Sequence, residues 1–93
     1  MSYVIISRST EAETDATPHR AERIQWMKGL QQQGIVILSG PSVDRTTSVF
    51  VIEAADAQAA RQTMESDPYQ VHGIRQNELI EWEIHYRAPI TAQ

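Results

Sequence analysis

Thr47-Ser48-Val49-Phe50-Val51-Ile52-Glu53 is the stretch that decides the fold. Its four central residues are β-branched or aromatic, which predicts a strand, and successive strand side chains point to opposite faces of a sheet. Both faces of this strand are therefore apolar. The opening stretch Tyr3-Val4-Ile5-Ile6 has the same character. The two stretches predict a pair of central strands in a sheet that is covered on both faces.

Helix and strand signals alternate around these two strands. A helix is expected over 17–33, because Thr17 can cap it, Pro18 suits its first turn and Gly34 suits its end. A strand over 35–38 is expected to form a hairpin with 47–53 through the polar turn 42–46. A second helix should begin at the cap Asp56.

The last strand is expected over 78–87, because apolar and polar side chains alternate there. Ile80, Trp82, Ile84 and Tyr86 would share one face of it. The tail 88–93 is expected to be frayed or to be an arm exchanged between subunits.

The resulting element order, βαββαβ, predicts an α+β fold of the ferredoxin-like sandwich type, with both helices on one face of the sheet. Two helices cover only one of the two apolar faces, so a second copy of the chain is expected on the other. We therefore expect one domain over 1–93 that forms a homodimer, a dimeric α+β barrel.

Composition limits the classes of partner. The 93 residues carry a net charge of −4 and have a pI of about 5.2, which argues against binding to nucleic acid or to an acidic membrane surface. The absence of cysteine excludes disulfides and thiolate metal sites. No export signal precedes the first strand, so a cytoplasmic location is expected.

Asp67 is the first candidate for chemistry. Pro68 disfavours helical geometry at the residue before it, so the second helix should end at about Ser66. Asp67 would then lie at the negative end of that helix, where a carboxylate is destabilised and becomes a better general base. The alternative is a solvated carboxylate in an Asp-Pro turn.

His72 is the titratable group expected nearest to that turn, and it is a candidate catalytic imidazole. The alternative is a solvated loop histidine. His19 and His85 are weaker candidates, one in the first turn of a helix and the other on the polar face of an edge strand. No two histidines have metal-ligand spacing on one element, so neither a metal nor a cofactor is expected.

Several short motifs, in this order, resemble the YCII-related (YciI-like) family of small dimeric α+β-barrel proteins. They cover about residues 3 to 86. They are Tyr3-Val4-Ile5-Ile6, Arg20 followed by Trp26-Met27-Lys28-Gly29-Leu30, Gly34, Ser39-Gly40-Pro41, Ser48-Val49-Phe50-Val51-Ile52, Asp67-Pro68-Tyr69 and Gly73-Ile74.

The resemblance implies a pocket between the first helix and the sheet that holds a proposed catalytic His–Asp pair. The aspartate corresponds to Asp67, but Arg23 stands where the family has its histidine. Arginine stays protonated near neutral pH and cannot exchange a proton. Arg23 could instead bind an anionic group while Asp67 accepts a proton, with His72 in reserve. The alternative is a structural ion pair, which would keep Asp67 ionised.

Further binding residues are expected around this pair. Ser39 could hydrogen-bond a polar ligand, and Gly40 lets a ligand come close to the backbone, although a plain strand-ending turn explains both equally well. Arg20 and Tyr69 belong to the family motifs and are also expected at the substrate site.

The predicted function is lyase or isomerase activity on a small, aromatic-derived acid, with Asp67 as general base. The alternatives are a non-catalytic module that binds a small, anionic ligand and a dimerisation module. The resemblance leaves open whether the chain is an enzyme, because Arg23 replaces the family histidine.

Overall fold

The computed structural model describes residues 1–10 and 16–89. The elements are β1 (Ser2–Ser9), a 3-10 turn η1 (Thr17–His19), α1 (Arg20–Gln32), β2 (Val36–Pro41), β3 (Thr47–Glu53), α2 (Ala57–Glu65), α3 (Pro68–Val71) and β4 (Arg75–Trp82). The predicted α+β, ferredoxin-like arrangement is confirmed. Within the described ranges, no helix has the length and apolar character needed to span a membrane.

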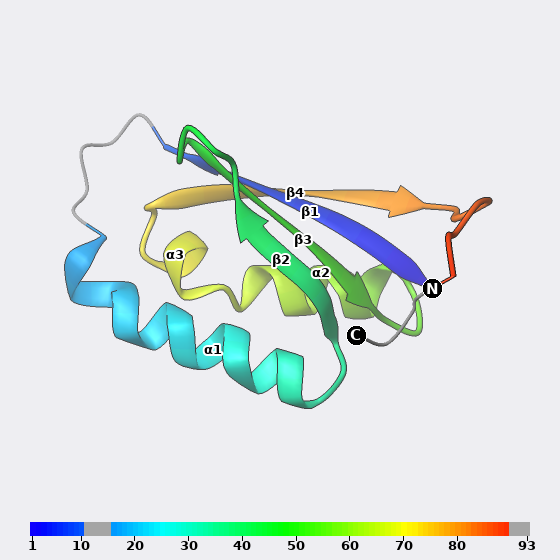
Figure 1. The fold of residues 1–93 in the computed structure, drawn as a ribbon. Helices are drawn as coiled ribbons and strands as arrows, with labels where there is room; N and C mark the ends of the chain where they lie inside the picture. The colour runs from blue at the N-terminus through cyan, green and yellow to red at the C-terminus, as the bar shows by residue number, and fades with distance from the viewer. Residues whose placement is uncertain (11–15, 90–93) are drawn as a thin grey trace.

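Four antiparallel strands form the sheet in the order β2-β3-β1-β4, with the two apolar strands in the centre. Within residues 1–10 and 16–89, the helices lie on one face of this sheet and the other face carries none (Figure 1). Ile5 lies opposite Phe50 on β3 and opposite Leu79 on β4, so these three side chains point toward the helices.

The core lies between the sheet and the helices. Tyr3, Ile5, Phe50 and Ile52 are buried there, and Ala60 and Met64 of α2 pack against them together with Val36. The Trp26 indole of α1 meets the Phe50 ring edge to face, with 6.0 Å between the ring centroids.

The helix-free face of the sheet remains apolar. Leu38, Val49, Ile80 and Trp82 are each 39–62% exposed on it. Exposed apolar side chains that form one patch mark an interaction surface more often than isolated ones do.

A bulge interrupts the pairing of β2 with β3. Val36 lies opposite Ile52, whereas Leu38 lies opposite Val51, so β2 contains one extra residue at this point. After the bulge, Ser39 lies opposite Phe50 and points toward α1, and Leu38 points to the helix-free face.

The structure corrects two predicted boundaries near the chain's turns and adds one short helix. The first α-helix begins at Arg20 rather than Thr17, because Thr17–His19 form a tighter 3-10 turn. Pro18 lies within the first two positions of that turn. The second strand runs to Pro41 rather than Leu38, since the bulge keeps Ser39, Gly40 and Pro41 paired with β3. The short helix α3 was not predicted.

The last strand is Arg75–Trp82, not 78–87. Its neighbour β1 pairs Ser9 with Arg75 and Ser2 with Trp82, so β1 offers no partner for Ile84 or Tyr86. These two residues therefore lie beyond the sheet. Of the tail 88–93, residues 90–93 fall outside the described part of the chain.

Phe50→Ala should lower the free energy of unfolding by about 3–5 kcal/mol, because Phe50 is fully buried and its removal leaves a cavity beside Trp26. Urea denaturation followed by circular dichroism measures this loss. Val43→Ala, at a position that is 99% exposed, is the control and should change the value by less than about 0.5 kcal/mol. Equal losses in both variants would contradict the assignment of Phe50 to the core.

Candidate functional site

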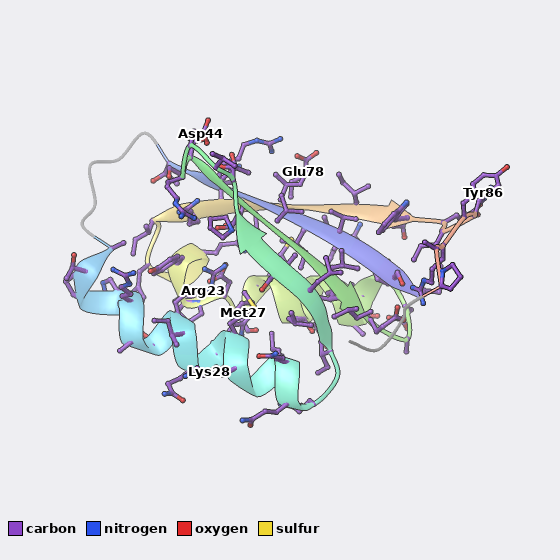
Figure 2. All side chains as sticks on the ribbon, viewed as in Figure 1. Arg23, Met27, Lys28, Asp44, Glu78 and Tyr86 are labelled. Carbon is purple, nitrogen blue, oxygen red and sulfur yellow. The ribbon has the colours of Figure 1, made fainter. Side chains whose placement is uncertain are left out.

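A cavity of about 170 Å³ lies between α1 and the paired strands β2 and β3. It is lined by Arg23, Met27, Ser39, Gly40, Pro41, Ser48 and Phe50. Figure 2 shows Arg23 and Met27 pointing from α1 toward the sheet, while Lys28 on the same helix points away from it. Three of the predicted ligand-binding residues, Arg23, Ser39 and Gly40, therefore meet at one cavity.

Arg23 is held in this position by Asp67. The Arg23 Nε atom lies 3.0 Å from Asp67 Oδ1, and Nη2 donates a hydrogen bond of 3.3 Å to Oδ2. The Arg23 side chain is 11% exposed and that of Asp67 is 0% exposed, so this is a buried ion pair. An ion pair between these two residues was the alternative considered from the sequence, and the structure contains it.

Aromatic rings surround the guanidinium of Arg23. Its central carbon lies 4.9 Å from the centroid of the Tyr69 ring, 5.5 Å from that of Trp26 and 5.6 Å from that of Phe50. Burial lowers the pKa of Arg23, and the nearby Asp67 carboxylate opposes this effect. Arginine starts from so high a pKa that the group still carries its charge near neutral pH.

The local backbone explains why Asp67 is buried here. α2 ends at Glu65, and Pro68 occupies the first turn of α3, so Asp67 becomes the N-cap of that short helix. Asp67 Oδ1 accepts a hydrogen bond of 2.9 Å from the Tyr69 N–H. The predicted position after a helix end is confirmed, but Asp67 also begins a second helix, where a capping carboxylate is stabilised.

Asn77 of β4 is the third group that binds Asp67. Its Nδ2 donates a hydrogen bond of 2.8 Å to Asp67 Oδ2. Each carboxylate oxygen thus has a nearby donor, and neither oxygen is exposed to solvent. Asp67 is not among the described residues that line the cavity, and it contacts the lining residue Arg23.

Three buried polar atoms around this pair lack a hydrogen bond to any described residue: Ser7 Oγ, Arg23 Nε and Asn77 Oδ1. The Nε atom is close to Asp67, but the direction of its N–H does not meet hydrogen-bond geometry. Ser7 and Asn77 are direct partners across β1 and β4, and Ser7 also lies opposite Ser48 of the cavity. Unsatisfied buried polar atoms are uncommon in folded proteins, and such atoms can form hydrogen bonds with a polar molecule that binds near them.

The other predicted site residues lie elsewhere. Arg20 is exposed at the start of α1, and Tyr69 contributes its ring and its N–H beneath Arg23. His72 ends α3, and its Nε2 is 3.4 Å from Glu22 Oε2. Its ring stacks on that of His19, with 3.8 Å between centroids. Neither Arg20 nor His72 is among the described residues that line the cavity.

Sequence reasoning missed Ser7, Asn77 and Ser48. A signal for the first two was present, since Ser7 continues the inward series of Tyr3 and Ile5, and Asn77 precedes the inward Leu79 by two residues. A polar residue at an inward strand position needs a hydrogen-bond partner and so indicates a buried polar site.

A larger cavity, of about 430 Å³, lies at the opposite end of the sheet. It is lined by Met1, Ser2 and residues 82–85. Its charged members, Glu83 and His85, are 86% and 68% exposed and form a surface pair. Because a buried charge held by several partners is the stronger indication of a functional site, we assign the candidate site to the smaller cavity beside Arg23.

Solved structures of two enzymes share this fold. One is the 5-chloro-2-hydroxyhydroquinone dehydrochlorinase of Burkholderia phenoliruptrix, in complex with 2,5-dihydroxybenzoquinone, with a TM-score of 0.75 and 17% identity. The match covers 89% of this chain and 94% of the dehydrochlorinase chain. The other is muconolactone isomerase, with a TM-score of 0.77, 14% identity and coverage of 99% and 98%. At these identities the likeness is one of fold.

Comparison with curated protein sequences gives no match. The family model of the YCII-related domain matches residues 1–83, which is most of the chain and includes every residue of the Arg23 cavity. This match confirms the resemblance that the motifs indicated. The chain belongs to the YCII-related family.

Proposed function

We propose that this chain binds a small anionic molecule in the cavity beside Arg23, and that Arg23 forms the principal contact with the anionic group. The observation that carries the proposal is a buried guanidinium that lines a cavity while a fully buried carboxylate holds it from behind. Such an arginine is pre-organised, so little side-chain entropy is lost when it binds a carboxylate.

The edge of the guanidinium that faces Asp67 carries Nε and Nη2. A ligand carboxylate would therefore be bound through Nη1, and the hydroxyl groups of Ser39 and Ser48 offer further hydrogen bonds from the opposite wall. Met27 and Phe50 supply an apolar surface for the rest of the ligand. This lining fits a small acid with an unsaturated or aromatic body.

A second candidate function is lyase or isomerase activity on such an acid, with Asp67 as the general base. It is supported by family membership and by the fold shared with a dehydrochlorinase and an isomerase. Proton transfer to Asp67 requires the ligand to draw Arg23 away, because the arginine now stands between the carboxylate and the cavity. His72, the reserve imidazole, would have to leave its stack with His19.

Arg23→Lys should weaken binding of the preferred acid by about 1–3 kcal/mol, because lysine keeps the charge but its single ammonium group cannot contact Asp67 with one edge and present Nη1 to the ligand with the other. Arg23→His should also bind the acid more weakly, while it restores the imidazole that the family carries beside this aspartate. Calorimetric titration with a panel of small aromatic and unsaturated acids measures the affinities. Proton exchange at the carbon next to the acid group, followed by NMR in D₂O, tests the second candidate.

Lys28→Gln is the matched control, since it removes a cation from the outward face of the same helix (Figure 2). Its affinity should equal that of the wild type. If all four proteins bind the acids equally, the anion site is refuted and Arg23 is a structural partner of Asp67 alone.

Asp67→Asn should lower the free energy of unfolding by about 3–5 kcal/mol, because it leaves the buried Arg23 without its counter-charge. The new amide would also set a donor against the Asn77 Nδ2 group if it kept the Tyr69 contact. Chemical denaturation measures the loss. Glu65→Gln, an exposed carboxylate at the end of α2, is the control and should be nearly neutral.

A double-mutant cycle separates the two roles of Asp67. Arg23→Gln combined with Asp67→Asn should be less destabilised than the sum of the single variants, since neither charge is then left buried alone. Additive losses would show that the ion pair does not couple the two helices in the way that we infer.

We further propose that the chain is a homodimer whose two helix-free sheet faces pack together. The exposed apolar side chains Leu38, Val49, Ile80 and Trp82 support this assembly. An interface of standard size buries about 800 Å² per partner, and one face of a four-stranded sheet is of that order. Burial at about 25 cal/mol per Å² then exceeds typical costs of association.

Light scattering at micromolar concentration should report twice the chain mass for the wild type and for Val43→Asp, whose charge falls in an exposed turn. Val49→Asp should report a single chain, because it places a charge in the centre of the apolar face. Far-ultraviolet circular dichroism verifies that both variants fold. A wild type that is monomeric under these conditions would contradict the proposed assembly.

A further inference from the structure

His19, Glu22 and His72 come together on the surface where α1 begins and α3 ends. One ligand atom from each of these side chains lies within 4.8 Å of the other two. The cluster shares no residue with the cavity lining and does not depend on the proposed anion site. We infer that His19, Glu22 and His72 form a binding site for a divalent transition metal ion.

The backbone beneath the three side chains is fixed on both sides. His19 is the N-cap of α1, and Glu22 lies three residues later on the same side of the first turn. His72 is the C-cap of α3, where its N–H donates to the Pro68 carbonyl at 3.0 Å. Gly73 follows with φ of +71°, a conformation that favours glycine and turns the chain into β4.

The Arg23–Asp67 pair joins the two helices that carry the cluster. Arg23 follows Glu22 directly in α1, and Asp67 begins α3. The relative position of the two helices is therefore set by a buried contact. The side chains of the cluster are more accessible: His72 is 36% exposed and Glu22 is 59% exposed, so they can adjust to an ion without displacing the core.

The distances allow metal binding after small side-chain rotations. Two ligand atoms at bond lengths of about 2.0–2.2 Å around a tetrahedral ion lie roughly 3.4 Å apart. His72 Nε2 and Glu22 Oε2 already lie 3.4 Å apart. The two imidazole rings now stack at 3.8 Å with an angle of 18° between their planes, and rotation of the His19 ring would bring its nitrogen toward the same point.

The donor set identifies the class of ion. Two imidazoles and one carboxylate suit Zn²⁺ and its transition-metal neighbours, whereas Mg²⁺ and Ca²⁺ require more oxygen ligands. Three protein ligands leave one tetrahedral position for water or a small molecule. Sequence spacing could not indicate this site, because His19 and His72 are distant in the chain.

Calorimetric titration of the EDTA-treated, dialysed full chain with ZnCl₂ tests the inference. The wild type should bind one Zn²⁺ per chain, and His19→Ala, Glu22→Gln and His72→Ala should each weaken binding at least about tenfold. His85→Ala is the matched control, since His85 forms an exposed pair with Glu83 and lies outside the cluster. It should bind Zn²⁺ as the wild type does.

Thermal melting with and without ZnCl₂ verifies that a variant which binds less Zn²⁺ is still folded. Zn²⁺ should raise the Tm of the wild type and of His85→Ala, but not that of Glu22→Gln, whose exposed side chain keeps its shape. No Zn²⁺ binding by the wild type at micromolar concentration would overturn the proposal. Equal binding by His72→Ala or Glu22→Gln would overturn it as well.

Discussion

The buried ion pair between Arg23 and Asp67 is the contact on which the arrangement of α1, α3 and the sheet edge depends. Its two charges come from elements that are far apart in the sequence, and Asn77 connects the same carboxylate to β4. A buried charge is costly without its partner, so the pair restricts the structure to conformations in which the two helices meet. The same restriction gives the cavity a charged wall in a fixed position.

An arginine rather than a histidine beside Asp67 determines what this pair can do. An imidazole beside an aspartate can gain and lose a proton near neutral pH, whereas a guanidinium cannot. The Arg23 side of the pair therefore carries a permanent positive charge at the cavity. Binding of an anion is the chemistry that this charge performs most directly, and for this reason we rank ligand binding above proton transfer.

The fold could be predicted from the sequence because its signals are local. The apolar runs around Val4 and Phe50 mark central strands, and the element order then selects the sheet topology. Within the site, the adjacency of Arg23, Ser39 and Gly40 followed from the family motifs. Ser7 and Asn77 have the spacing of inward residues, but they were missed because the last strand was predicted to begin after Asn77 and its register against Ser7 was not known. The role of Asp67 as a cap of α3 was missed because a four-residue helix has too short a pattern to detect.

The bulge in β2 determines to which face of the sheet each later side chain of that strand points. If the same residues paired with β3 without the bulge, Leu38 would lie opposite Phe50 and enter the cavity, and Ser39 would lie opposite Val49 on the helix-free face. Regular pairing of these residues would thus exchange a polar wall for an apolar one and place a hydroxyl group within the apolar patch. The one extra residue of the bulge therefore determines the lining of the binding site and of the exposed sheet face together, although the two surfaces lie on opposite sides of the sheet.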